Sequence, residues 1–111
     1  MVTGAAQGVG LAFTEALIER GLGVVMVDVA PQLENVAAEL GDEATVRSLV
    51  ADLKNPAWIE ALGSATQGLE VGLAIANAGV AFVGRYLDMA PARRRAIIDV
   101  NCAATADLAS W

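Results

Sequence analysis

The sequence predicts an α/β protein in which a parallel sheet of about four strands is covered by helices on both faces. Short apolar runs alternate with segments whose apolar residues recur at helical spacing, in the order β-α-β-α-β-α-β-α. Runs that are apolar throughout and too short for helices are typical of strands buried on both faces. Their alternation with helices implies parallel strands and right-handed crossovers. The 111 residues suit one domain, and a hydrophobic content of 56% argues against disorder.

The first strand, residues 1–3, runs directly into a turn that contains Gly4, Gly8 and Gly10. Glycine allows a sharp turn from strand to helix without steric cost, and without a Cβ it lets a diphosphate approach the main chain. The helix that follows offers N–H groups and a positive dipole end to that anion. The turn therefore predicts a dinucleotide-binding site, and a glycine-rich turn without a ligand is the alternative. It is not a P-loop, because no Lys-Ser/Thr pair follows the last glycine.

The next helix is expected over residues 10–20, with Gly21 after its last turn. Its predicted apolar face consists of Val9, Phe13, Ala16 and Leu17. Residues 22–27 then form the second predicted strand, which ends at Asp28. Because the first strand has almost no residues before its turn, we expect the N-terminus to be truncated.

The rest of the chain repeats the alternation. The remaining predicted elements are a helix over 33–40, a strand over 44–50, a helix that starts at Asn55-Pro56, a strand over 71–76 and a helix that starts at Pro91. The apolar face of the third helix is predicted to contain Trp58, Ile59 and Leu62. No internal repeat or low-complexity linker interrupts this order.

Polar residues follow the predicted strands, with Asp28 after the second, Asp52 after the third and Asn77 after the fourth. The carboxyl ends of parallel strands share one edge of the sheet, and ligands bind there where the strand order reverses. An exposed strand end explains any one of these residues. All of them together, in register with the glycine turn, predict a binding site.

The position and charge of Asp28 predict which dinucleotide binds. Asp28 lies 18 residues beyond Gly10, near the about 20 expected for an acid that hydrogen-bonds the adenosine ribose. A carboxylate there repels a 2′-phosphate, and no neighbouring residue supplies a compensating cation. The neighbours considered are Ala5, Ala6, Gln7 and Val29. NAD is therefore favoured over NADP.

Composition and charge exclude several classes of function. The net charge of −6 argues against a nucleic-acid surface, and Arg93–Arg95 is interpreted as a solvated helix face. Without histidine, and with Cys102 as the one cysteine, the chain has no triad, no disulfide framework and almost no zinc ligands. The longest apolar stretch, residues 71–83, is too short to span a membrane. The N-terminus carries no signal-peptide pattern, so a cytoplasmic location is expected.

Four segments together resemble the short-chain dehydrogenase/reductase family. They are TGAAQGVG at Thr3–Gly10, ADL at Ala51–Leu53, ANAG at Ala76–Gly79 and DVN at Asp99–Asn101. In ANAG, Ala76 departs from the first asparagine of the family's Asn-Asn-Ala-Gly. The resemblance assigns cofactor binding to Thr3, Gly4, Gln7, Gly8, Val9, Gly10, Asp28, Asp52, Leu53, Asn77, Ala78 and Gly79. It assigns to Asn101 the first place in the family's catalytic set of asparagine, serine, tyrosine and lysine.

The resemblance implies a fragment, residues 1–111, of a Rossmann-type NAD(P)-binding domain. The intact enzyme would transfer a hydride between the nicotinamide and a small-molecule carbonyl or secondary alcohol. The family's Tyr-x-x-x-Lys does not occur in the chain, since Tyr86 and Lys54 come in the wrong order, so we expect the chain to be inactive alone. A non-catalytic NAD- or nucleotide-binding module and an inactive truncated product are the alternatives. The family is often dimeric or tetrameric, which leaves a homo-oligomer open, and the substrate is not indicated.

Overall fold

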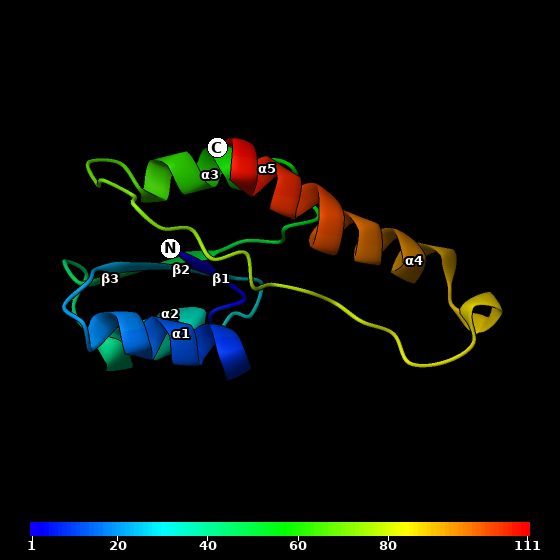
Figure 1. The fold of residues 1–111 in the computed structure, drawn as a ribbon, viewed down its shortest axis with the longest axis horizontal. Coiled ribbons are helices and arrows are strands. Elements are labelled where there is room, and N and C mark those ends of the chain that lie inside the picture. Colours follow the sequence, from blue (N-terminus) through cyan, green and yellow to red (C-terminus); the bar gives the residue numbers. More distant parts are fainter.

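The computed structural model describes residues 1–111. Its elements are β1 (Val2–Thr3), α1 (Gly8–Ile18), β2 (Val24–Asp28), α2 (Leu33–Leu40), β3 (Val46–Val50), α3 (Trp58–Ala65), the 3₁₀ turn η1 (Tyr86–Asp88), α4 (Pro91–Ile98), the π-helical turn η2 (Asp99–Ala103) and α5 (Ala104–Ser110). Helices α1 and α2 cover one face of the sheet, and α3 and α5 cover the other (Figure 1). The α/β class and the helices on both faces are as predicted. No helix is both long and apolar enough to cross a bilayer.

The sheet has three parallel strands in the order β1-β2-β3, not the predicted four. Residues 71–76, the predicted fourth strand, reach β1 only through one bridge, between Ile75 and Val2. Thr3 N–H donates to the Ile75 carbonyl at 3.0 Å, and Ile75 N–H donates to the Met1 carbonyl at 2.9 Å. The ladder is this short because β1 is only two residues long. The segment still lies on the side of β1 opposite β2, so the strand order reverses at β1, where ligands bind in open α/β sheets.

The core lies on both faces of β2, because successive side chains of a strand point to opposite sides. Val24 and Met26 pack with Leu33 and Ala37 of α2 in one cluster. Val25 and Val27 pack in the second cluster, which contains Trp58, Leu62, Ala104 and Leu108 from α3 and α5. The strand is therefore buried on both faces, as its continuous apolar run predicts.

The predicted apolar face of α1 is wrong for Val9 and Phe13, whereas Ala16 and Leu17 are half-buried and Leu17 packs against the core. Val9 is 66% exposed and Phe13 is 44% exposed, whereas Gly10 and Thr14 are buried. A Cβ on Gly10 would lie 2.0 Å from the Gly4 carbonyl oxygen, so α1 packs through its glycine against the turn. That close approach sets the rotation of the helix about its axis. The fully buried residues of this face are a glycine and a threonine, and the apolar side chains of Leu11, Leu17 and Ile18 pack partly buried beside them.

Several element boundaries differ from those predicted, among them the end of α1 at Ile18 instead of residue 20 and the start of β2 at Val24 instead of residue 22. Helix α1 starts at Gly8 and β3 starts at Val46. Helix α3 starts at Trp58, because Asn55 and Pro56 belong to a preceding turn in which Asn55 Oδ1 accepts the Ala57 N–H at 3.2 Å.

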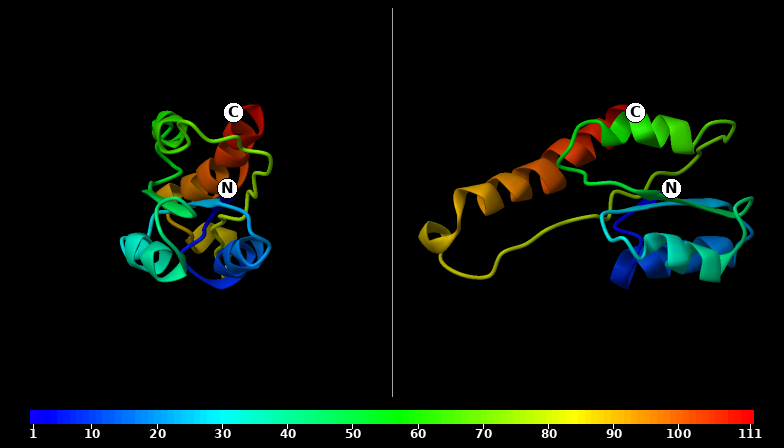
Figure 2. Two further views of the ribbon diagram at one scale, coloured as in Figure 1. Left: turned by 90° about the vertical axis from the view of Figure 1, so that its left-hand side faces the viewer. Right: turned by 180° about the vertical axis from the view of Figure 1, so that it is seen from behind.

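Other predicted boundaries are confirmed, including both ends of α2 at Leu33 and Leu40. Gly21, at φ +76°, donates its N–H to the Ile18 carbonyl at 2.8 Å where α1 ends. Pro91 begins the last helix, which runs through the π-helical turn η2 to Ser110. This helix and the segment before it extend well beyond the sheet (Figure 2), and the chain measures 46 Å along its longest axis.

Candidate nucleotide-binding site

The three glycines of the turn between β1 and α1 serve different steric purposes. Gly4 has φ +67°, and a Cβ there would lie 2.9 Å from the Ala78 Cα atom. Gly10 has no room for a Cβ because the Gly4 carbonyl lies against it. Gly8 has φ +59°, but nothing lies within 4 Å of its Cβ position. Gly4 and Gly10 thus allow close packing, while Gly8 gives the main chain a left-handed bend next to open space.

The end of β2 holds the first half of this turn. Gly4 N–H and Ala5 N–H both donate to the Val27 carbonyl, at 2.8 and 3.3 Å. Ala6 N–H donates to Asp28 Oδ2 at 3.0 Å. The other carboxylate oxygen, Asp28 Oδ1, accepts the Ala30 N–H at 3.0 Å. The half-buried Asp28 carboxylate therefore lies directly beside the glycine turn, as the sequence predicts.

Thr3 and Asn77 connect β1 to the segment after residue 76. The buried Thr3 hydroxyl accepts the N–H groups of Asn77 and Ala78, both at 3.1 Å, and donates to the Ile75 carbonyl at 3.3 Å. The Asn77 side-chain amide donates to the carbonyl oxygens of Thr3 at 3.0 Å and Gly4 at 3.2 Å. These bonds bring the glycine turn and the Asn77–Gly79 segment together.

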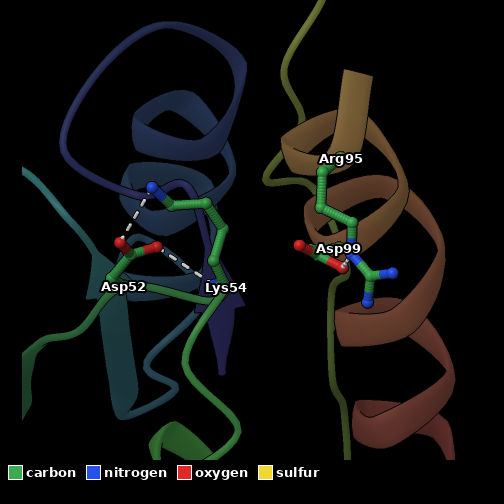
Figure 3. Close-up of polar contacts among 4 residues, drawn as sticks. All are labelled: Asp52, Lys54, Arg95 and Asp99. Atoms are coloured by element: carbon green, nitrogen blue, oxygen red, sulfur yellow. Dashed lines mark hydrogen bonds and ion pairs between the residues drawn. The ribbon is translucent and has the colours of Figure 1, made fainter. Parts of the chain in front are cut away.

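Asp52 is held by Lys54, two residues further along the chain (Figure 3). Asp52 Oδ1 accepts the Lys54 N–H at 3.0 Å, and the ammonium lies 3.2 Å from Oδ2. The main-chain hydrogen bond and then the ammonium lower the pKa of the Asp52 carboxyl, against a partial opposing effect of desolvation. Both side chains are about half exposed, so the ion pair adds little to stability.

Most of the predicted cofactor-binding residues line one groove, with a volume of about 570 Å³. Nine of the twelve line it, namely Gly4, Gln7, Gly8, Asp28, Asp52, Leu53, Asn77, Ala78 and Gly79. The other three are Thr3 and Gly10, which are buried, and Val9, which is exposed. The groove also contains residues outside the prediction, namely Val29, Ala51, Lys54, Val80, Ala96 and Val100. Of these, Ala51 and Val100 belong to the quoted ADL and DVN segments, and Lys54 is a cation two residues after a strand-end aspartate.

Asn101 lies in the π-helical turn η2 and is exposed, outside the set of residues that line the groove. Its Oδ1 accepts the Val80 N–H and its Nδ2 donates to the Val80 carbonyl, both at 2.9 Å. Asp99, in the same turn, pairs with Arg95 at 2.7 Å (Figure 3). Asn101 therefore contacts the edge of the groove, through Val80 and beside Gly79, whose Cβ position lies 3.5 Å from Asn101 Oδ1.

A family model described as short chain dehydrogenase matches residues 1–110. The chain belongs to the short-chain dehydrogenase family. It is 32% identical over 104 residues to the oxidoreductase UcpA of Escherichia coli strain K12, a match that covers 91% of this chain and 40% of that protein. It is 39% identical over 107 residues to a 1-deoxy-11-beta-hydroxypentalenate dehydrogenase of Streptomyces exfoliatus, covering 91% and 39%.

Solved short-chain dehydrogenase structures share the fold. A 3-ketoacyl-(acyl-carrier-protein) reductase from Brucella melitensis complexed with NADH matches with a TM-score of 0.88 and 26% identity, over 97% of this chain and 45% of that one. A short-chain dehydrogenase from Sphingobium yanoikuyae in complex with NADPH matches with a TM-score of 0.81 and 32% identity, over 98% and 44%. The chain thus spans about 40% of the curated relatives that it matches. No group of three or more His, Cys, Asp or Glu side chains that could hold a metal ion occurs in it.

Proposed function

We propose that this chain is the NAD-binding portion of an oxidoreductase that transfers a hydride between the nicotinamide and a small-molecule carbonyl or secondary alcohol. The observation that carries the proposal is the position of Asp28, whose carboxylate lies 3.0 Å from the Ala6 N–H, in the same groove as Gly8. An acid at the end of the second strand, beside a glycine turn, is the arrangement that recognises an adenosine ribose in dinucleotide-binding sheets. Membership in the family supports the same reaction class.

The residues of the groove fit a nicotinamide dinucleotide. The open space at Gly8 and the first N–H groups of α1 would take the diphosphate, because these groups have no acceptor within the helix. Asp28 would accept hydrogen bonds from the ribose hydroxyls, and Asp52 with Leu53 would contact the adenine. Asn77 would hold the floor of the groove against the glycine turn, through its bonds to Thr3 and Gly4.

The charges of the groove support NAD rather than NADP. A 2′-phosphate would approach the Asp28 carboxylate, which repels it. Lys54 is the one cation that lines the groove, and its ammonium is engaged with Asp52 at 3.2 Å. Among the matched solved structures, some contain NADH and others NADPH, so the preference rests on the groove of this chain.

When bound, the nicotinamide would supply or accept the hydride. Asn101 would contribute to the reaction by fixing the segment at Val80, because both polar atoms of its side chain are bonded there. Tyr86 is 66% exposed, and Lys54 is paired with Asp52. These two residues therefore do not form a tyrosine–lysine pair that could pass a proton to a substrate. We therefore expect these 111 residues to bind the cofactor without turning a substrate over.

Titration of the purified chain with NAD⁺ and with NADP⁺, followed by calorimetry, tests the proposal. The expected result is saturable binding of NAD⁺, at least about tenfold tighter than that of NADP⁺, because one unfavourable charge contact is worth on the order of 1.4 kcal/mol near a protein surface. Absence of saturable NAD⁺ binding, or tighter NADP⁺ binding, would contradict it.

A non-catalytic nucleotide-binding module is the second candidate, favoured by the unsuitable positions of Tyr86 and Lys54. Sequencing the encoding DNA beyond Trp111 separates the two candidates. A serine followed by Tyr-x-x-x-Lys in the same reading frame supports the enzyme. A stop codon after Trp111, with NAD⁺ bound and no turnover on a panel of alcohols, supports the module.

A further inference from the structure

We propose that Asp28 is a positioning residue for the diphosphate-binding turn, in addition to its contact with the ribose. The inference rests on the proposed function, since it concerns how the same groove holds a nucleotide diphosphate. It extends the role of Asp28 to ligands that Asp28 itself cannot touch.

The first three N–H groups of the turn are all used by the end of β2. Those of Gly4 and Ala5 donate to the Val27 carbonyl, and that of Ala6 donates to the Asp28 side chain. The next N–H groups belong to the start of α1, where no intrahelical acceptor exists. An anion in the groove would therefore be bound from Gln7 onward, and not by the first half of the turn.

The direction of those later N–H groups depends on where Ala6 is held. Gln7 is extended, at φ −160° and ψ 169°, and Gly8 is left-handed, at φ +59°. This region favours glycine, and nothing lies within 4 Å of the Gly8 Cβ position, so no packed side chain there helps to fix the turn. The Ala6–Asp28 bond is thus the last hydrogen bond between the sheet and the turn before the left-handed bend at Gly8.

The bond joins residues that are 22 positions apart, and its acceptor is a carboxylate oxygen. Hydrogen bonds to ionised acceptors are roughly twice as strong as neutral ones. The second oxygen of Asp28 accepts the Ala30 N–H, so the carboxylate is fixed from both sides. A neutral side chain of the same shape cannot reproduce this, because an amide has only one acceptor atom for the two N–H groups.

Two nucleotides separate positioning from direct contact. ADP carries the ribose hydroxyls that Asp28 would bind, whereas 2′,3′-dideoxy-ADP lacks both and keeps the diphosphate. Dissociation constants for both ligands are measured for the unsubstituted chain, for Asp28→Asn and for Glu34→Gln. Glu34 is exposed and outside the groove, so Glu34→Gln matches the loss of one negative charge without touching the site.

The expected result is that Asp28→Asn weakens 2′,3′-dideoxy-ADP binding about tenfold, the loss expected for one hydrogen bond to a charged group. Glu34→Gln leaves it unchanged within about twofold. In the ligand-free protein, the Ala6 amide is expected to exchange faster in Asp28→Asn than in Glu34→Gln. The two variants are compared at temperatures at which their free energies of unfolding are equal.

Equal 2′,3′-dideoxy-ADP affinities for Asp28→Asn and the unsubstituted chain, with ADP alone weakened, would overturn the inference and leave the proposed function standing. Unchanged exchange at Ala6 would overturn it as well. If the unsubstituted chain binds neither nucleotide nor NAD⁺, the proposed function fails, and the inference fails with it.

Discussion

Thr3 and Asn77 hold each other across 74 residues of chain, through the Asn77 amide to the Thr3 carbonyl at 3.0 Å and the Asn77 N–H to the Thr3 hydroxyl at 3.1 Å. They occupy the place where a longer strand after residue 71 would pair with β1. Only one β-bridge forms there, at Ile75. Hydrogen bonds from the Thr3 and Asn77 side chains therefore hold the two segments together in place of a β-ladder. The floor of the groove depends on these two residues.

Thr3→Val is expected to lower the free energy of unfolding by about 1–3 kcal/mol, because it leaves the N–H groups of Asn77 and Ala78 without their acceptor at a buried position. Valine keeps the shape of threonine, so packing is nearly unchanged. Urea denaturation followed by circular dichroism measures the change. Thr3→Ser keeps the hydroxyl and is the control, and equal losses for both variants would contradict the explanation.

Alanine substitutions at two glycines of the turn should differ sharply. Gly10→Ala places a Cβ 2.0 Å from the Gly4 carbonyl and is expected to displace α1 from the turn, at a cost of about 3 kcal/mol or more. Gly8→Ala meets no atom and costs only the strain of a left-handed residue, about 1–2 kcal/mol. Thermal unfolding of the two variants gives both values.

Gly63→Ala is the control for these two glycines. Gly63 lies within α3, with nothing within 4 Å of its Cβ position. Alanine there should stabilise the chain by about 0.5–1 kcal/mol, because alanine is the better helix former. A Gly10→Ala variant as stable as Gly63→Ala would show that the close approach of α1 to the turn is wrong.

Lys54→Met is expected to raise the pKa of the Asp52 carboxyl toward its ordinary value without restoring it fully. The largest cause of the lowered pKa is the main-chain N–H of residue 54, which methionine keeps, and only the contribution of the ammonium is lost. NMR titration of the Asp52 side chain measures the shift. An unchanged pKa would contradict the ion pair.

The same pKa sets the sign of a pH dependence. A carboxyl whose pKa is lowered on folding stabilises the protein above its unfolded-state pKa, and this contribution is lost as the pH falls through the folded-state pKa. The chain should therefore lose stability in acid, and Lys54→Met should lose less of it than the unsubstituted chain. Asp42 has a lowered pKa too, through its bonds with Thr45, so it contributes in the same direction in both proteins.

Asn101→Ala is expected to speed amide hydrogen exchange at Val80, because it removes both hydrogen bonds between the π-helical turn and that residue. Exchange measured by NMR or mass spectrometry reports the change directly. Thr105→Ala is the control, since Thr105 bonds only the Asn101 carbonyl, at 3.2 Å. Equal protection of Val80 in both variants would show that Asn101 does not fix the segment.

Local pattern alone determined the α/β class, the burial of β2 on both faces, the glycine turn and the polar residues at the strand ends. These features depend only on residue type and on spacing within a few positions. Such local patterns give the same strands, helices and turns in any open α/β sheet. They were sufficient to identify five residues that line one groove, namely Gly4, Gly8, Asp28, Asp52 and Asn77. The family resemblance added Gln7, Leu53, Ala78 and Gly79, which also line the groove, and Asn101, which does not.

Tertiary structure decided the features that depend on residues far apart in the chain. The length of β1 limits the sheet to three strands, and the contact of Gly10 with Gly4 sets which face of α1 is buried. The bond between Asp28 and Ala6, and the pairing of Asn101 with Val80, join positions 21 or 22 residues apart. No periodicity encodes such partners, because close packing of the folded chain selects which groups come within hydrogen-bond distance.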